Sequence, residues 1–274
     1  MKKKRAVGAV ARNIIAWIFS AICLIPLLLI IFNAFKDKKA AASMNLSLPY
    51  PIALDNFVTV VQKGKLLRSF INSLTYAAGS TILCVFLASL AAYVLSRNQS
   101  KLNKFFYLFI VLGITLPINY VALTKVLQFL HLNNTVIGII LLYTAMQLPF
   151  MTFLIHSFVS KVPVELDEAA VIDGCGPWKL FFYIMFPLLK PAIATASVLT
   201  FLNTWNEFVS PLYFLNKTEQ WPMTLSVYNF FGMYYKDWNL VCADILLTSL
   251  PVLVVYLIGQ KYIVSGMTAG AVKG

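Results

Sequence analysis

Long apolar runs without a charged residue limit this chain to one kind of environment. The first run, residues 14–35, contains 22 residues and no charge. At about 1.5 Å per residue, a helix of this length crosses the roughly 30 Å hydrocarbon core of a bilayer. The composition agrees, because 60% of the residues are hydrophobic, 12% are charged and the mean hydropathy is +0.79. These values exclude a soluble globular protein and predict an all-α integral membrane protein.

Five further apolar runs bring the expected number of membrane spans to six. The fifth run is interrupted only by Glu207, and the sixth carries charges only near its ends, at Asp244 and Lys261. We therefore expect spans at about 14–35, 69–96, 105–130, 134–157, 189–215 and 244–263. The first span follows four basic residues, as in a signal peptide, but its apolar run exceeds the roughly 7–15 residues of such a peptide. We expect a retained anchor.

Lysine and arginine residues set the expected orientation, because they accumulate in the short cytoplasmic loops of membrane proteins. The N-terminal cluster at residues 2–5 and the basic residues of the short loop 97–104 both favour the cytoplasmic side. An even number of spans then places both termini in the cytoplasm. The net charge of +12 is explained by this topology, so we expect no nucleic-acid partner.

The sequence offers little chemistry for an enzyme or a metal site. Its four cysteines include no Cys-x-x-Cys pair, and its two histidines, His131 and His156, have no nearby second ligand. A membrane enzyme that acts on lipid would need a cluster of such residues. No Gly-x-x-x-x-Gly-Lys-Ser/Thr loop is present, so we expect no bound nucleotide, no cofactor and no metal on this chain. Any ATP that drives transport would be hydrolysed by another polypeptide.

Residues 161–187 interrupt the apolar sequence with a short polar segment between spans four and five. Pro163 suits the first turn of a helix, and the acidic residues that follow it favour the positive end of the helix dipole. Gly174 suits the left-handed residue just past a helix end. The pattern predicts a helix of about three turns, roughly 16 Å long, which is too short to cross a bilayer. We expect it to lie along the inner surface of the membrane, where another molecule can bind it.

This segment resembles the signature of the membrane-spanning subunits of bacterial ABC importers. That signature is Glu-Ala-Ala, three residues, Gly, nine residues, Ile, one residue and Leu-Pro. Here it is matched by Glu168-Ala169-Ala170, Gly174, Ile184 and Phe186-Pro187, with Phe in place of the usual Leu. In that family the segment is the coupling helix, which docks in a cleft of the cytoplasmic ATPase. The resemblance implies a coupling role for Glu165, Glu168, Ala169, Ala170, Asp173, Gly174 and Pro187.

Two further stretches resemble the carbohydrate branch of the family, and more narrowly the second permease of maltose-type systems. They are residues 203–208, Asn-Thr-Trp-Asn-Glu-Phe, and residues 266–274 at the C-terminus. In that branch the C-terminal tail reaches between the two ATPase subunits. The resemblance therefore implies a cytoplasmic tail at 265–274 that contacts the ATPase through Gly266, Gly270 and Lys273.

The resemblance also implies a set of partners and a location. We expect a second, homologous permease, two ATPase subunits that use ATP and Mg²⁺, an extracytoplasmic solute-binding protein and the surrounding lipid. The complex would lie in the bacterial cytoplasmic membrane and import a sugar or oligosaccharide by alternating access. An ABC importer for an amino acid or an osmolyte shares the coupling signature and stays an alternative.

Glu207 is an ionisable residue inside an apolar run, so it is expected to face a neighbouring helix or a water-filled cavity. Carboxylates, amides and aromatic rings are the groups that bind sugars, but a polar clamp between helices explains Glu207 equally well. Prolines beside two amide residues could free carbonyls to line a cavity, or could simply kink the helices. The candidate pathway residues are Asn203, Trp205, Asn206, Glu207, Asn119 and Gln147. Solvation at the outer surface accounts for Asp244.

An ion-coupled secondary transporter is the second function considered. Such a transporter needs intramembrane charges or broken repeat helices to bind its coupling ion. Glu207 is the only deep candidate, and the sequence shows no internal repeat. A secondary transporter also does not need an inner-surface segment such as 161–187 to bind another protein, so the importer is favoured.

Overall fold

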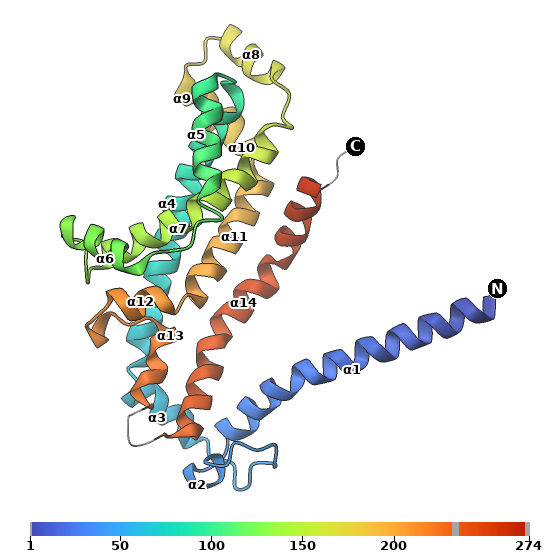
Figure 1. The fold of residues 1–274 in the computed structure, drawn as a ribbon, viewed down its shortest axis with the longest axis vertical. Helices are drawn as coiled ribbons and strands as arrows, with labels where there is room; N and C mark the ends of the chain where they lie inside the picture. Colours follow the sequence, from blue (N-terminus) through green and yellow to red (C-terminus); the bar gives the residue numbers. More distant parts are fainter. Residues whose placement is uncertain (1, 232–235, 272–274) are drawn as a thin grey trace. The chain divides into compact units, whose positions relative to one another are not determined.

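The computed structural model describes residues 2–231 and 236–271, and within these ranges it is built from helices and contains no β-strand (Figure 1). The chain divides into two compact units. Unit 1 combines Met1–Leu67 with Ser226–Leu250, and unit 2 combines Arg68–Leu225 with Pro251–Gly274. The last helix, α14 (Trp238–Ala271), contributes residues to both.

Unit 1 contains α1 (Lys2–Ala34), α2 (Lys38–Ala41), α3 (Asp55–Lys63), a 3-10 turn η3 (Val227–Asn229) and the first part of α14. A buried asparagine joins three of these elements. The Asn56 amide donates to the carbonyl oxygens of Ala34 and Lys36, both at 2.8 Å, and Asn239 of α14 donates to Asn56 Oδ1 at 2.7 Å. Since buried polar groups need partners, this network fixes α3 at the end of α1.

Lys36 lies just after α1 and is only 1% exposed. Its ammonium donates to Asn33 Oδ1 at 3.1 Å and to the Oδ1 and carbonyl oxygen of Asn45, both at 2.8 Å. Burial lowers the pKa of Lys36, because a charged amine loses solvation there. Three amide and carbonyl acceptors compensate for that loss.

Unit 2 holds the remaining helices, apart from Leu66 and Leu67 of α4 and Ser226 of α13, which belong to unit 1. They are α4 (Leu66–Arg97), α5 (Lys101–Leu112), α6 (Tyr120–Phe129), α7 (Val136–Val159), α8 (Glu165–Ile172), α9 (Pro177–Lys179), a π-helical turn η1 (Leu180–Met185), α10 (Phe186–Leu188), α11 (Lys190–Asn206), α12 (Val209–Phe214), a 3-10 turn η2 (Thr218–Gln220) and α13 (Met223–Ser226).

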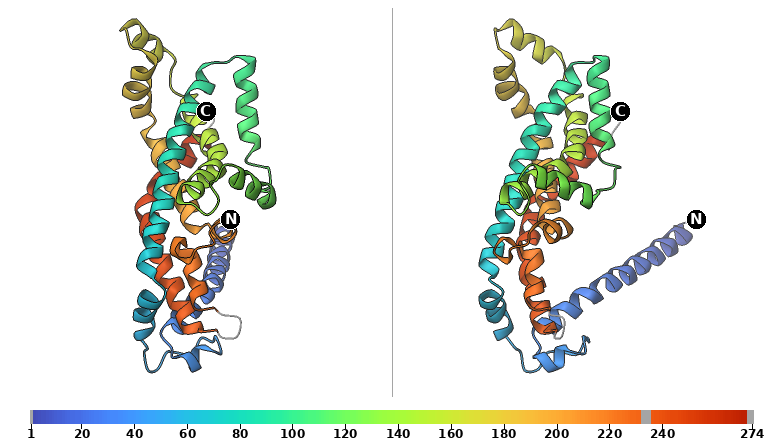
Figure 2. Two further views of the ribbon diagram at one scale, coloured as in Figure 1. Left: turned by 90° about the vertical axis from the view of Figure 1, so that its left-hand side faces the viewer. Right: turned by 60° about the vertical axis from the view of Figure 1, so that its left-hand side comes forward.

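Helices α4, α7 and α11 share the core of unit 2 and lie side by side (Figure 1, Figure 2). Small buried residues let their backbones approach closely, as is common between membrane helices. These residues include Ala88 and Ala92 of α4 and Ala192 and Ala196 of α11, all 0% exposed. The second half of α14 packs on α11 in the same way, because a Cβ at Gly259 would lie only 2.5 Å from Val198.

Several expected spans coincide with single long helices in the structure. Within the described residues, four helical stretches are long and apolar enough to cross a membrane: Arg12–Ala34, Leu66–Arg97, Val136–Val159 and Trp238–Val264. A fifth crossing arises if Pro177–Leu188 and Lys190–Asn206, which meet at a 77° bend, count as one broken span. The protein is therefore an all-helical, multi-pass membrane protein with four to five such spans in the structure.

The expected span 105–130 is not one helix. Helix α5 ends at Leu112, α6 begins at Tyr120, and the intervening residues are not helical. Pro117 lies in this gap, where it lacks a backbone N–H donor and disfavours helical geometry at the preceding residue. Pro149 has a milder effect, because α7 continues through it.

The expected span 189–215 is also divided. Helix α11 ends at Asn206, Glu207 has extended backbone angles, and α12 begins at Val209. At the C-terminus the expected tail is helical instead of a separate segment, since α14 continues to Ala271 and includes Gly266 and Gly270. Lys273 lies outside the described residues.

Candidate functional site

The polar segment 161–187 contains a short helix, α8, near α9 at one end of unit 2 (Figure 1). It has eight residues, about two turns instead of the expected three, because it starts at Glu165 and leaves Pro163 outside. Its end agrees with the prediction: Gly174 has φ +80°, and the next residue, Cys175, donates its N–H to the carbonyl of Ala170 at 2.9 Å. This is a left-handed helix stop.

One face of α8 packs on its own chain. Asp167 is 9% exposed and Ala170 is 3% exposed, and the two lie three residues apart on the same side of the helix. Asp167 Oδ2 accepts a hydrogen bond from Arg97 Nε at 2.6 Å, and Ala170 belongs to the core shared by α4, α7 and α11. The expected docking role of Ala170 is revised, because this side chain is covered by its own core.

The opposite face of α8 is open. Glu165, Glu168, Ala169 and Asp173 are exposed, so these expected coupling residues are accessible to another molecule. Apolar side chains accompany them: Leu166 is 42% exposed, Val171 61% and Ile172 86%. Carboxylates beside large exposed aliphatic groups form the mixed surface that a protein partner can cover.

Pro187 lies apart from α8, in the later part of the segment that contains α9, η1 and α10. It occupies the first turn of α10 and is exposed, just before the 77° bend into α11. Aromatic stacking holds this later part to α4, since the rings of Phe86 and Phe182 lie 6.3 Å apart and Trp178 stacks on Phe182 at 6.1 Å. The residues expected to act in coupling therefore lie in two parts of the segment. The first part is α8, which ends at the turn formed by Gly174, and the second is the stretch from α9 to α10, which contains Pro187.

Two candidate pathway residues meet across α7 and α11. Asn203 Nδ2 lies 3.2 Å from Gln147 Oε1, and Asn203 is exposed while Gln147 is half-buried. Their amides retain further donors and acceptors for a polar ligand. Among the predicted pathway residues, these two therefore have amide groups that meet and stay partly exposed.

The carboxylate of Glu207 is bound by groups of α12 and α7. Its carboxylate accepts the backbone N–H groups of Val209 at 3.0 Å and Ser210 at 2.9 Å, and the Tyr143 hydroxyl lies 3.3 Å from Oε2. It thus satisfies free donors in the first turn of α12 and links that turn to α7. These contacts favour the polar clamp over substrate binding. Tyr143 was missed in the sequence, because a tyrosine in an apolar run gives no local signal of its partner.

The other candidates do not join this group. Trp205 is 2% exposed, and its ring lies 5.9 Å from that of Phe70. Asn206 is exposed and donates to the carbonyl of Leu202 in its own helix, while Asn119 caps α6 by accepting the Ala122 N–H at 3.0 Å. The structure thus gives these three residues packing and helix-capping contacts.

Asp244 corrects a further expectation. Instead of being solvated at the surface, it is 1% exposed, and both carboxylate oxygens accept from the Ser226 hydroxyl, at 2.8 and 3.0 Å. It lies within α14 in unit 1, where burial demands such a partner. Across the part of the chain that the structure describes, no three metal-ligating side chains come together.

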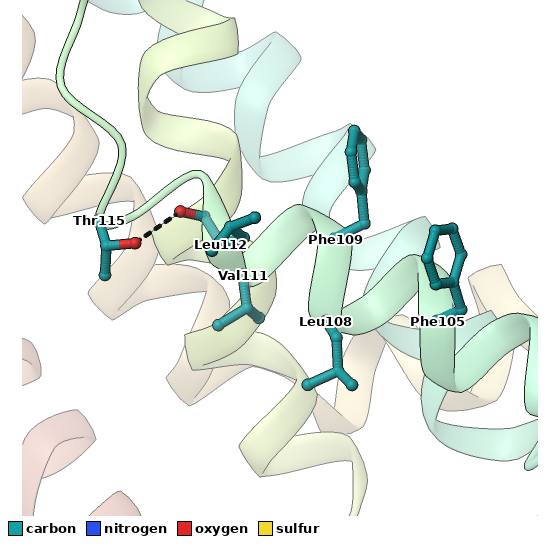
Figure 3. Close-up of a pocket in the computed structure, with 6 residues that line it drawn as sticks. All are labelled: Phe105, Leu108, Phe109, Val111, Leu112 and Thr115. Carbon is teal, nitrogen blue, oxygen red and sulfur yellow. Dashed lines mark hydrogen bonds between the residues drawn. The ribbon is translucent and has the colours of Figure 1, made fainter.

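A pocket on α5 has an apolar lining, unlike the polar candidate pathway residues. Its lining residues are almost entirely apolar, and the Thr115 hydroxyl is occupied by a 2.9 Å hydrogen bond to the Leu112 carbonyl (Figure 3). The lining consists of Phe105, Leu108, Phe109, Val111, Leu112 and Thr115. Such a surface suits lipid or another apolar helix and offers nothing to recognise sugar hydroxyls.

Comparison with known proteins agrees with the signature of the polar segment. The family described as "Binding-protein-dependent transport system inner membrane component" matches residues 84–269, which include α8 and the 203–208 stretch. A full-length relative is the multiple sugar-binding transport system permease protein MsmG of Streptococcus mutans, which is 33% identical and covers 100% of both chains. The melibiose/raffinose/stachyose import permease protein MelC of Bacillus subtilis is 35% identical over 96% of each chain.

The fold has a solved counterpart. A chain from the crystal structure of a bacterial ABC transporter involved in the import of the acidic polysaccharide alginate aligns with a TM-score of 0.83. The alignment covers 94% of this chain and 96% of the other, at 20% sequence identity. A second alginate transporter structure, in complex with an alginate pentasaccharide-bound periplasmic protein, aligns with a TM-score of 0.66 at 18% identity. At these identities the likeness concerns the fold.

Proposed function

Because the chain belongs to the family of binding-protein-dependent transport system inner membrane components, the permease subunits of ABC importers, we propose that it forms half of a pathway for sugar or oligosaccharide import. Such permeases are membrane subunits and not enzymes, and ATP is hydrolysed on a partner. The sugar assignment is supported by relatives that match nearly end to end and whose names specify sugars, MsmG and MelC among them.

Within this proposal the chain crosses the bacterial cytoplasmic membrane six times, with α5 and α6 together forming the third crossing and both termini in the cytoplasm. A second, homologous permease completes the pathway. Two ATPase subunits, which bind ATP and Mg²⁺, lie below it, and an extracytoplasmic binding protein delivers the solute from above. This chain itself holds no cofactor.

The observation that carries the coupling role is the open face of α8, formed by Glu165, Glu168 and Ala169 with the exposed Ile172. This face is the docking surface for the ATPase, and the C-terminal residues Gly266 and Gly270 of α14, together with Lys273, provide a second contact. Closure of the ATPases on ATP moves the coupling helices, and the spans turn the cavity outward. Hydrolysis then resets the cavity inward, which is alternating access.

Purification of the tagged chain in mild detergent from its native membrane tests the proposal. We expect a second permease and an ATPase to co-purify, and we expect the ATPase rate of the complex in lipid to rise when binding protein loaded with an oligosaccharide is added. Amino acids and osmolytes serve as comparison solutes. A chain that purifies without an ATPase under several extraction conditions contradicts the proposal and directs attention to ion-gradient-driven uptake.

Asn203→Ala and Gln147→Ala test the proposed pathway. Each removes an amide from the α7–α11 pair, and we expect the maximal rate of sugar uptake to fall roughly two- to tenfold, the range for loss of one net hydrogen bond. ATPase association should not change. Asn206→Ala is the matched control, since its amide bonds within its own helix. Equal uptake rates in all three variants would remove Asn203 and Gln147 from the pathway.

A further inference from the structure

One guanidinium group connects three helices at the base of α8. Arg97 is the last residue of α4, and its Nε lies 2.6 Å from Asp167 Oδ2 in α8. Its Nη1 lies 3.4 Å from the carbonyl oxygen of Val159, the last residue of α7. The ion pair is shielded, since the Arg97 and Asp167 side chains are 15% and 12% exposed. Charge pairs at such depth are screened by salt much less than surface pairs.

The contact is also where α8 is attached to its own chain. Ala170, one turn after Asp167, packs in the core that includes Val159 of α7 and Ala92 of α4. The remaining side chains of α8 are exposed. A force applied to the open face of α8 therefore reaches the ends of α4 and α7 through Asp167 and Ala170. Only the first of these contacts is directional, because a charge-assisted hydrogen bond resists both pulling and rotation.

Within the described part of the chain, the ion pair leaves one polar atom of each side chain unpaired. Among the described residues, Arg97 Nη2 and Asp167 Oδ1 are both buried and have no hydrogen-bond partner. A guanidinium and a carboxylate can form two parallel hydrogen bonds, so these two atoms can pair with each other if α8 or one of the two side chains moves. Buried polar atoms without partners are unfavourable, so a movement that pairs these two atoms would strengthen the contact instead of breaking it.

We infer that Arg97 and Asp167 are positioning residues that transmit the movement of α8 to the ends of α4 and α7. This inference rests on the proposed function, because it assumes that an ATPase moves α8. It differs from docking, since neither side chain belongs to the open face. The pair sets how much solute moves for each ATP hydrolysed, while the open face sets whether the ATPase binds.

The test uses the complete importer, purified and reconstituted in lipid vesicles with its binding protein. The variants are Arg97→Ala, Asp167→Ala, Asp167→Asn and the double variant Arg97→Asp with Asp167→Arg, and the matched control is Lys101→Ala, an exposed basic residue at the start of α5. Three quantities are measured: the ATPase retained per permease, the unfolding temperature, and the solute transported per ATP hydrolysed. Asp167→Asn preserves side-chain shape, so it remains informative if an alanine variant misfolds.

We expect the single variants to retain the ATPase but to transport roughly fivefold less solute per ATP, at the low end of typical coupling between sites. The control should match the wild type, and the double variant should recover at least half of the loss. A ratio within twofold of wild type in every folded single variant overturns the inference, as does loss of the ATPase from those variants. If the wild-type complex itself lacks an ATPase, the proposed function fails instead.

Discussion

Replacing Glu168 with lysine is expected to release the ATPase from the permease without unfolding it. Glu168 lies in the first turn of α8, on the open face, and is exposed, whereas its neighbour Asp167 faces inward. Reversing a charge at a docking surface places like charges together or leaves a partner cation unpaired. We expect at least about tenfold less ATPase to co-purify, and a matching fall in the ATPase rate stimulated by the loaded binding protein.

The fold should tolerate this change. Loss of an acidic side chain from the first turn of a helix costs about 0.3–1 kcal/mol in an exposed position. Asp55→Lys is the matched control, because Asp55 is likewise an exposed acid in the first turn of a short helix, α3. Both variants should unfold at similar temperatures, and only Glu168→Lys should lose the ATPase. Normal ATPase recovery with Glu168→Lys would show that α8 docks by another face or not at all.

The sequence predicts the simplest spans well, because the length of an uncharged run is itself the physical requirement for crossing a bilayer. The expected spans 69–96 and 134–157 correspond within a few residues to α4 (Leu66–Arg97) and α7 (Val136–Val159). Composition fails where the chain stays apolar but the helix stops. The gap before α6 and the extended Glu207 depend on which neighbours satisfy the freed backbone groups.

The candidate site divides in the same way. Gly174 was predicted correctly as a left-handed helix stop, because that signal is local: glycine adopts positive φ at the lowest steric cost. The ion pair between Arg97 and Asp167 joins residues 70 positions apart, and the contact between Tyr143 and Glu207 joins residues 64 apart. No periodicity in the sequence links such distant residues. The sequence therefore does not indicate which side of α8 packs against α4 and α7, and the structure is needed to identify it.

Glu207→Ala is expected to lower the stability of the protein and to leave solute recognition unchanged. The change removes the acceptor of the Val209 and Ser210 N–H groups and of the Tyr143 hydroxyl. Leaving such donors without an acceptor costs about 1–3 kcal/mol, so the unfolding temperature in detergent should fall. The solute concentration that gives half-maximal uptake by the folded fraction should stay unchanged, because the carboxylate already serves α12 and α7.

Tyr143→Phe separates the two contacts of Glu207. It removes only the hydroxyl and keeps the buried ring, so its cost should be nearer 1 kcal/mol, the typical net value of one hydrogen bond. If Glu207 is a clamp, both variants lower stability in the order Glu207→Ala, then Tyr143→Phe, and neither changes the preference among sugars. If Glu207→Ala instead leaves the unfolding temperature unchanged and abolishes uptake, the carboxylate acts on the solute. The clamp would then be wrong, and Glu207 would join Asn203 and Gln147 in the pathway.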